Sequence, residues 1–170
     1  MFINANNGHR FLIVSLLVVI LDQLTKYLVV NNIEYGSSGI AVFPFFNITH
    51  VYNTGAAFSF LAGMGGWQRW FFVAVAIVIT LILLVVLLRT SRSSRYTCLG
   101  IALVIGGAIG NLIDRLLYGY VVDFLLFYIK TDDFFWAYPT FNVADIGVCV
   151  GATVLICIGL FGKEKEEGKH

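Results

Sequence analysis

Four runs of apolar residues, each about twenty residues long, limit what this chain can fold into. At about 1.5 Å per residue, a helix of that length crosses the roughly 30 Å hydrocarbon core of a bilayer. The runs lack the polar–apolar alternation of an outer-membrane barrel strand. The predicted spans are about 11–30, 67–88, 97–118 and 142–160. The sequence therefore predicts a mainly α-helical, polytopic membrane protein with a single domain over 1–170.

The composition supports this fold class. Of the 170 residues, 59% are hydrophobic and 12% are charged, and the mean hydropathy is +0.86. A soluble domain would carry about 25% charged residues. The net charge of +1 gives no reason to expect a nucleic-acid partner, and we expect a monomer whose partners include membrane lipids.

The basic residues predict the orientation in the membrane. They flank the apolar runs at Arg10, Arg89, Arg92, Arg95, Lys163, Lys165 and Lys169. By the positive-inside rule these positions, and with them both termini, are cytoplasmic. The first run contains Asp22 and Lys26 and is followed by no small-residue cleavage site, so we interpret it as a retained span and not as a signal peptide.

Two segments are expected on the opposite, extracytoplasmic side. Residues 40–60 are rich in β-branched and aromatic residues and are interrupted by Pro44 and Gly55. This pattern predicts a small β-element between the first two spans. Asn53 is either a turn residue beside Gly55 or an amide directed at a peptide backbone. Residues 119–141 are predicted to form a short external loop.

Polar residues within the apolar runs gather at one depth. Those in the outer half of the membrane are Asp22, Asn111, Arg115, Asp123, Asn142 and Asp145. Charged groups in hydrocarbon are costly, and they are retained when they are paired or functional. Because several spans contribute to this set at the same depth, the sequence predicts a site there.

The residue types available at that depth narrow the chemistry. His9 and His170 lie in the terminal tails and His50 has no acidic neighbour in sequence, so no Ser–His or Cys–His pair is expected. A zinc site needs about three ligands, usually including His or Cys, so we expect no metal and no cofactor. Carboxylates remain. Two carboxylates close together share a proton, so one can act as a general base while the other polarises a carbonyl.

The pairing of these carboxylates stays open at this level. Asp123 with Asp145 is favoured modestly over Asp114 with Asp145, because Asp114 is expected in a buried ion pair with a neighbouring helix or with Arg115. Asp22 and Lys26 are four residues apart and can form a structural ion pair or handle substrate.

The remaining polar residues have two interpretations each. Asn53, Asn111 and Asn142 can hold a peptide backbone, although Asn142 is equally explained as a helix cap. Arg115 can fix the geometry or orient a polar head group.

Five motifs resemble those of the lipoprotein signal peptidases, also called signal peptidase II. They are LDQLTK at 21–26, YNTGAAFS at 52–59, GNLIDR at 110–115, VVDF at 121–124 and FNVAD at 141–145. The resemblance implies an intramembrane aspartic endopeptidase of the bacterial inner membrane, a multi-pass protein with its active site near the periplasmic face. It implies cleavage of diacylglyceryl-modified prolipoproteins before the lipidated cysteine, and inhibition by globomycin.

The resemblance also implies roles for individual residues. Asp123 and Asp145 would be the catalytic pair, and Asn53, Asn111, Arg115 and Asn142 would contact the substrate. Structural support would come from Asp22, Lys26, Gly55 and Asp114. From the residues alone, a small membrane transporter or proton-coupled channel, a non-catalytic assembly factor and a lipid-modifying transferase are the alternatives.

Overall fold

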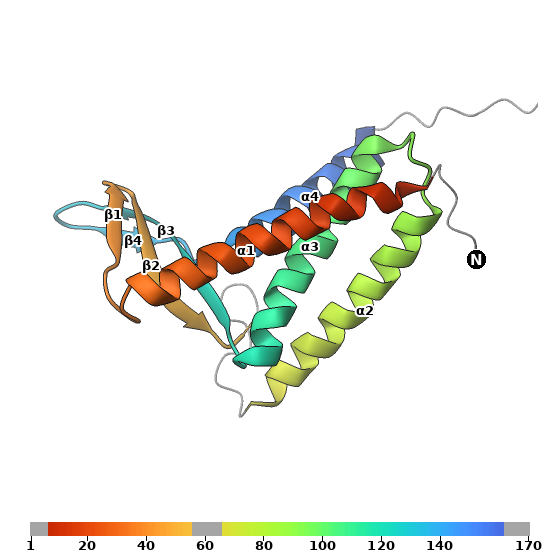
Figure 1. Ribbon diagram of the computed structural model, residues 1–170. Coiled ribbons are helices and arrows are strands. Elements are labelled where there is room, and N and C mark those ends of the chain that lie inside the picture. Colours follow the sequence, from red (N-terminus) through yellow and green to blue (C-terminus); the bar gives the residue numbers. More distant parts are fainter. Residues whose placement is uncertain (1–6, 56–65, 162–170) are drawn as a thin grey trace, which may run out of the picture.

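The computed structural model describes residues 7–55 and 66–161. Within these residues, four helices are long and apolar enough to cross a membrane. They are α1 (Leu12–Asn32), preceded by the 3-10 turn η1 (Gly8–Phe11), α2 (Trp67–Arg89), α3 (Arg95–Leu117) and α4 (Val143–Phe161). Their positions confirm the predicted fold class, and Figure 1 shows them as one bundle with a small sheet at one end.

The central helix of the bundle is α3, which contacts α1, α2 and α4. Glycines make these contacts close. A Cβ atom at Gly106 would lie 2.8 Å from the backbone oxygen of Ser15 on α1, and one at Gly107 would overlap the backbone oxygen of Ala144 on α4. The small residues of α3 therefore let it pack tightly against two other helices.

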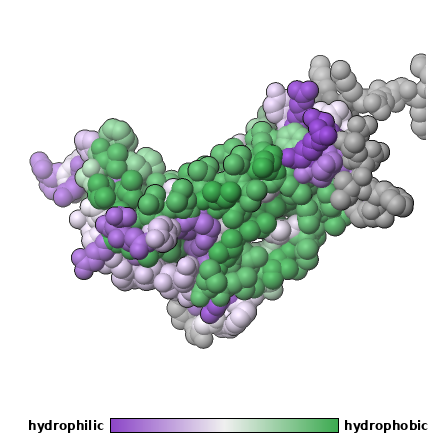
Figure 2. Space-filling view, viewed as in Figure 1, coloured by the Kyte–Doolittle hydropathy of each residue, from purple (hydrophilic) through white to green (hydrophobic). Residues whose placement is uncertain are grey.

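The outer surface of the bundle is apolar. Hydrophobic residues cover the helical part of the face in Figure 2, while hydrophilic residues gather near the sheet and at the opposite end. Most of α2 is exposed, and among its residues only Gln68, Val73 and Leu87 are buried. A surface of this kind matches a lipid environment, where apolar side chains need no protein cover.

The sheet is antiparallel, with the strand order β1-β2-β3-β4. Its strands are β1 (Ile40–Phe43), β2 (Phe46–Asn53), β3 (Val121–Lys130) and β4 (Phe135–Ala137). The first two lie in the segment predicted as a β-element over 40–60, of which residues 56–60 lie outside the described part of the chain.

The other two strands lie where the sequence predicted only a loop over 119–141. The first four residues of β3, Val121 to Phe124, are all buried, so β3 begins without the polar–apolar alternation that marks a half-buried strand. This is why the strand was not recognised from the sequence.

Three local features hold β3 beside the helices. Gly119 has a φ of +87°, a backbone conformation that glycine adopts without strain, and it turns the chain from the end of α3 into β3. Phe124 and Leu125 donate their backbone N–H groups to Phe141 O at 3.0 and 2.8 Å. The start of β3 is thereby fixed next to the start of α4.

Candidate active site

Five polar side chains meet where the sheet joins the helices. They come from five places in the chain: Asn53 at the end of β2, Asn111 on α3, Asp123 on β3, Asn142 just before α4, and Asp145 in the first turn of α4. The register pairs Asn53 with Val121 and Val51 with Asp123, so β2 runs alongside the strand that carries Asp123. Each of these residues was a site candidate from the sequence.

Asn142 connects the two carboxylates. Its Nδ2 donates to Asp123 Oδ1 at 2.7 Å, and its backbone N–H donates to Asp145 Oδ2 at 3.1 Å. Its Oδ1 accepts from the backbone N–H of Asp145 at 2.9 Å. The last two bonds form a capping box at the start of α4. Asn142 therefore caps the helix and orients both acids, and its side chain is fully buried.

Asp123 is buried and held by two amides. Asn53 Nδ2 donates to its Oδ2 at 3.0 Å, opposite the bond from Asn142. Burial, which disfavours the charged carboxylate, raises the pKa of Asp123 to about 7, and the nearby Asp145 adds to the increase. The two amide donors oppose it because they stabilise the ionised form. Asp123 can therefore hold a proton near neutral pH.

Asp145 is partly exposed, and Asn111 orients it from α3. Asn111 Nδ2 donates to Asp145 Oδ1 at 2.8 Å. Asn111 Oδ1 accepts from Lys26 Nζ and from Asn142 Nδ2, both at 3.1 Å. Because this oxygen receives two donors, the amide can only turn its nitrogen toward Asp145.

A buried ionic cluster lies behind this pair. Lys26 Nζ is 2.8 Å from Asp22 Oδ2 and 2.9 Å from Asp114 Oδ2, and all three side chains are at most 4% exposed. Asp114 therefore pairs with Lys26 on α1, the neighbouring-helix alternative of the sequence analysis.

Each acid of this cluster also holds a segment that carries one of the two candidate catalytic acids. Asp22 Oδ1 accepts from the backbone N–H of Ala144 at 2.9 Å, and Asp114 Oδ2 accepts from that of Val122 at 3.0 Å. The cluster thus ties α1 to the start of α4, and α3 to β3.

Gln23 is a member of this cluster that sequence reasoning missed. Its Nε2 lies within hydrogen-bond distance of Asp22 Oδ2, Gly110 O and Asp114 Oδ1, at 3.1, 3.2 and 2.9 Å. The sequence did contain a signal for this role, because Gln23 is an amide within an apolar span and follows the acid Asp22.

Arg115 braces the turn that follows β2. Its Nη2 donates to Gly55 O at 3.0 Å, and its guanidinium lies 5.3 Å from the ring centre of Phe72 on α2. Gly55 donates its backbone N–H to Asn53 Oδ1 at 3.0 Å. Arg115 and Gly55 together therefore fix the position of the Asn53 side chain beside Asp123.

A cavity of about 660 Å³ opens onto these residues. Its polar side has Asn53, Asn111, Arg115, Asp123 and Asp145, and residues 138–141 and part of α4 complete the wall. Sequence reasoning did not assign the α4 wall, whose Ile146, Cys149 and Val150 are exposed on the outside of the bundle. The cavity therefore joins a carboxylate pair to a surface that faces lipid.

Among residues 7–55 and 66–161, no group of three or more His, Cys, Asp or Glu side chains is arranged to hold a metal ion. The donors that do converge are carboxylates and amides, a set suited to moving a proton and holding a peptide.

Known proteins resemble this chain over nearly its whole length. The family described as signal peptidase (SPase) II matches residues 14–161. A lipoprotein signal peptidase of Alteromonas mediterranea is 48% identical, covering 94% of this chain and 86% of its own length. One of Actinobacillus succinogenes is 45% identical and covers 96% of this chain and 98% of its own.

Two solved structures resemble this chain in fold as well as in sequence. A bacterial membrane enzyme determined by the in meso method at 2.3 Å resolution superposes with a TM-score of 0.80 at 30% identity, covering 98% of this chain and 99% of its own. A second such enzyme, determined at 1.9 Å, has a TM-score of 0.74 at 33% identity and covers 91% of this chain and 95% of its own. By sequence and by fold, the chain belongs to the signal peptidase II family and is a membrane peptidase.

Proposed function

We propose that this protein removes the signal peptide from diacylglyceryl-modified prolipoproteins, using Asp123 and Asp145 as its catalytic acids. The observation that carries the proposal is the linkage of these two acids through Asn142, next to a cavity that reaches the lipid-facing side of α4. Family membership supplies the reaction class, since its relatives are named lipoprotein signal peptidases. These relatives favour a peptidase over the transporter or channel alternative.

The proposed hydrolysis depends on one proton that Asp123 and Asp145 share. Asp123 is the more buried acid, and burial raises its pKa to about 7, so we assign the resting proton of the pair to Asp123. Asp145, ionised, takes a proton from a water as the water oxygen attacks the scissile carbonyl carbon. Asp123 gives its proton to the carbonyl oxygen. As the tetrahedral intermediate collapses and its C–N bond breaks, Asp145 gives its proton to the leaving nitrogen, and Asp123 takes a proton back from a hydroxyl group of the intermediate.

Positioning comes from the amides and the arginine. Asn53 and Asn111 flank the two acids and present polar groups to the cavity, where they can hold an extended peptide backbone. Arg115 keeps the Asn53 turn in place through Gly55. Orientation within a site of this kind accounts for a large part of peptidase rate enhancement.

Substrate access follows from where the cavity opens. The signal peptide and the diacylglyceryl group of a prolipoprotein already lie in the bilayer, so they can enter sideways along α4. Globomycin-type cyclic peptides would occupy the same cavity. We place the active site near the periplasmic face, with both termini cytoplasmic and the protein acting as a monomer. The arginines at the opposite end of the helices support this orientation by the positive-inside rule.

The decisive experiment measures cleavage of a diacylglyceryl-modified precursor by the purified protein and its variants. Asp123→Asn and Asp145→Asn should each lose turnover while remaining folded, as checked by cooperative thermal unfolding. Asp132→Asn, in an exposed turn, is the matched control and should cleave normally. If Asp123→Asn cleaves at nearly the wild-type rate, the proposed pair is wrong.

A further inference from the structure

A second cavity, of about 690 Å³, lies at the other end of the bundle. Its lining comes from η1 and the first turn of α1, and from the α2–α3 connection with the first residue of α3: Arg10, Phe11, Ile13, Val14, Ser91, Arg92, Ser93 and Arg95. We call this cavity the basic pocket. Figure 1 places the two walls of the pocket at the end of the helices farthest from the sheet, so it is separate from the candidate active site.

The two walls are held together by backbone contacts. Gly8 donates its N–H to Thr90 O at 3.0 Å, and Asn7 forms an isolated β-bridge with Ser91. A Cβ atom at Gly8 would lie 2.8 Å from both Cys98 Sγ and Leu87 O. Because η1 packs this closely onto α2 and α3, the basic pocket is a fixed feature of the fold.

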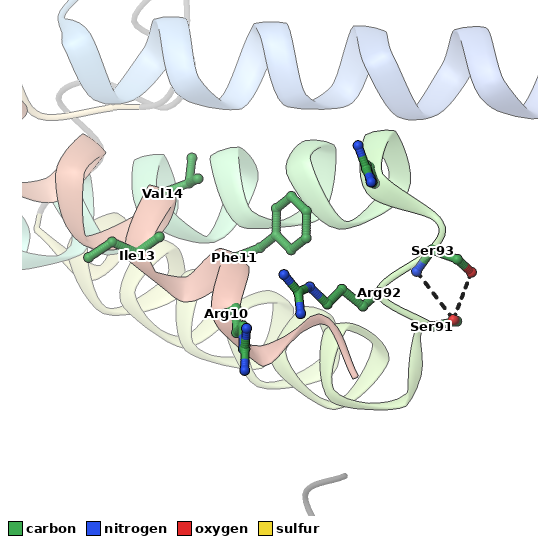
Figure 3. A pocket seen from close by; sticks show the side chains of 8 residues that line it. Arg10, Phe11, Ile13, Val14, Ser91, Arg92 and Ser93 are labelled. Carbon is green, nitrogen blue, oxygen red and sulfur yellow. Dashed lines mark hydrogen bonds between the residues drawn. The ribbon is translucent and has the colours of Figure 1, made fainter. Parts of the chain in front are cut away.

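Its charge is entirely positive. The lining contains three arginines and no carboxylate. Within the described ranges 7–55 and 66–161, both ion pairs belong to Lys26 at the opposite end of the bundle, so no acid neutralises these guanidiniums there. Figure 3 shows Arg92 reaching from the α2–α3 connection toward Phe11 on the facing wall. Guanidinium groups favour phosphate because they can donate two parallel hydrogen bonds to it.

The hydroxyl groups of the lining add a polar edge. Ser91 Oγ and Ser93 Oγ lie 2.8 Å apart, and Ser93 also donates its backbone N–H to Ser91 Oγ at 3.3 Å, as drawn in Figure 3. These contacts join the two serines to each other within the α2–α3 connection. The polar half of the lining therefore comes from the α2–α3 connection together with Arg10.

The other half of the lining is apolar. Phe11, Ile13 and Val14 belong to the start of the first span, and Ile13 is 56% exposed. The basic pocket thus lies at the end of a candidate membrane span, where we expect the lipid head groups of a bilayer. An inorganic phosphate would leave this apolar wall uncovered, whereas a molecule with a phosphate and an acyl chain would match both halves.

We propose that the basic pocket binds an anionic phospholipid, with the phosphate head group among Arg10, Arg92 and Arg95 and the start of an acyl chain along Ile13 and Val14. This inference does not depend on the proposed peptidase mechanism. Bound lipid would join η1 to the α2–α3 connection, and it would stabilise the folded protein by mass action.

The test titrates the purified, delipidated full-length protein, in a neutral detergent, with dioleoyl phosphatidylglycerol and follows the unfolding temperature. Dioleoyl phosphatidylcholine has the same chains and no net charge, and inorganic phosphate has no chains. We expect saturable stabilisation by phosphatidylglycerol alone. Arg92→Gln and Arg95→Gln should each weaken the apparent affinity about fivefold, and both side chains are exposed, so neither change should impair folding.

Arg89→Gln is the matched control, because Arg89 is exposed near the same end of the bundle but does not line the basic pocket. It should bind phosphatidylglycerol as the wild type does. Equal stabilisation by phosphatidylcholine, equal stabilisation by inorganic phosphate, or an equal loss in Arg89→Gln would each overturn the proposal. The readout is the unfolding temperature at each lipid concentration, so the result is independent of whether the protein cleaves its substrate.

Discussion

Asn142 Nδ2 donates to Asp123 Oδ1 at 2.7 Å, and this oxygen is the nearest of the three acceptors within hydrogen-bond distance of that side-chain nitrogen. The bond joins the residue before α4 to the strand that follows α3. It sets the position of Asp123 relative to Asp145, because the backbone of Asn142 also holds Asp145. The geometry of the pair therefore depends on a residue that is itself neither acid nor base.

Two substitutions of Asn142 should separate its role as a helix cap from its role in positioning the two acids. Asn142→Ser keeps a capping oxygen but loses the Nδ2 donor, so we expect stability near wild type and kcat lowered about 10²-fold through misplacement of the acids. Asn142→Ala should lose the same activity and in addition about 1 kcal/mol of stability, the usual value of a cap. Precursor cleavage and thermal unfolding measure the two effects. Full activity in Asn142→Ser would contradict the positioning role.

The pH profile should report the proton on Asp123. Its raised pKa of about 7 predicts that kcat/KM falls as the pH rises through about 7, because the ionised side chain has no proton to give. The apparent value belongs to the coupled pair. Asn53→Leu removes a donor that lowers this pKa, so the alkaline limb should move to higher pH.

Asn31→Leu is the control for that shift, since Asn31 is exposed and its side-chain amide donates within its own helix, to Tyr27 O. Its pH profile should match that of the wild type. An alkaline limb that stays in place or moves to lower pH in Asn53→Leu would contradict the assignment of the proton to Asp123.

The same pKa has a consequence for stability. The folded protein binds the Asp123 proton more tightly than the unfolded chain, whose aspartate has the ordinary pKa of 3.8. The free energy of unfolding from this group should therefore be highest below about pH 4 and should decrease as the pH rises toward 7. Asp123→Asn should flatten this part of the stability curve, as measured by thermal unfolding across pH. An unchanged slope would show that Asp123 titrates normally.

Lys26 should be needed for folding more than for chemistry. Lys26→Met leaves Asp22 and Asp114 buried without a counter-charge, and we expect a loss of about 3–5 kcal/mol of stability. Adding Asp114→Asn removes one of the uncompensated acids, so the double variant should be more stable than Lys26→Met alone. Chemical denaturation in detergent measures both. A double variant less stable than the single one would show that Asp114 is not held in place by Lys26.

A side chain at Gly107 should clash with α4 and lower the free energy of unfolding. In Gly107→Ala the new methyl group would meet the backbone oxygen of Ala144, which cannot rotate away, so we expect a loss of about 1–3 kcal/mol. Gly159→Ala is the matched control on α4, because a Cβ atom there meets nothing within 4 Å. It should be neutral or slightly stabilising, as alanine favours helix. Similar unfolding temperatures for the two variants would contradict the close contact of α3 with α4.

The membrane spans were predictable because their signal is local. A run of about twenty apolar residues leaves few alternatives to a spanning helix, and the structure begins and ends each helix within a few residues of the prediction. The candidate site residues were also visible, since amides and charges such as Asn111 and Asp145 are costly in hydrocarbon. Strand β3 was missed because its first four residues are all buried and show no alternation.

The sequence by itself determined the fold class with its four candidate spans, and it predicted that polar groups gather at one depth and that carboxylates carry the chemistry. Only the tertiary structure decided that Asp114 pairs with Lys26, that Asn142 bridges the two acids, and that the basic pocket forms between η1 and the α2–α3 connection. The hydropathy signal comes from neighbouring residues, whereas contacts of this kind join groups far apart in the sequence, such as Asp22 and the backbone N–H of Ala144, which are 122 positions apart. The packing of the helices and the sheet determines which of these groups pair, because a buried charge or amide is stable only with a partner inside the folded protein.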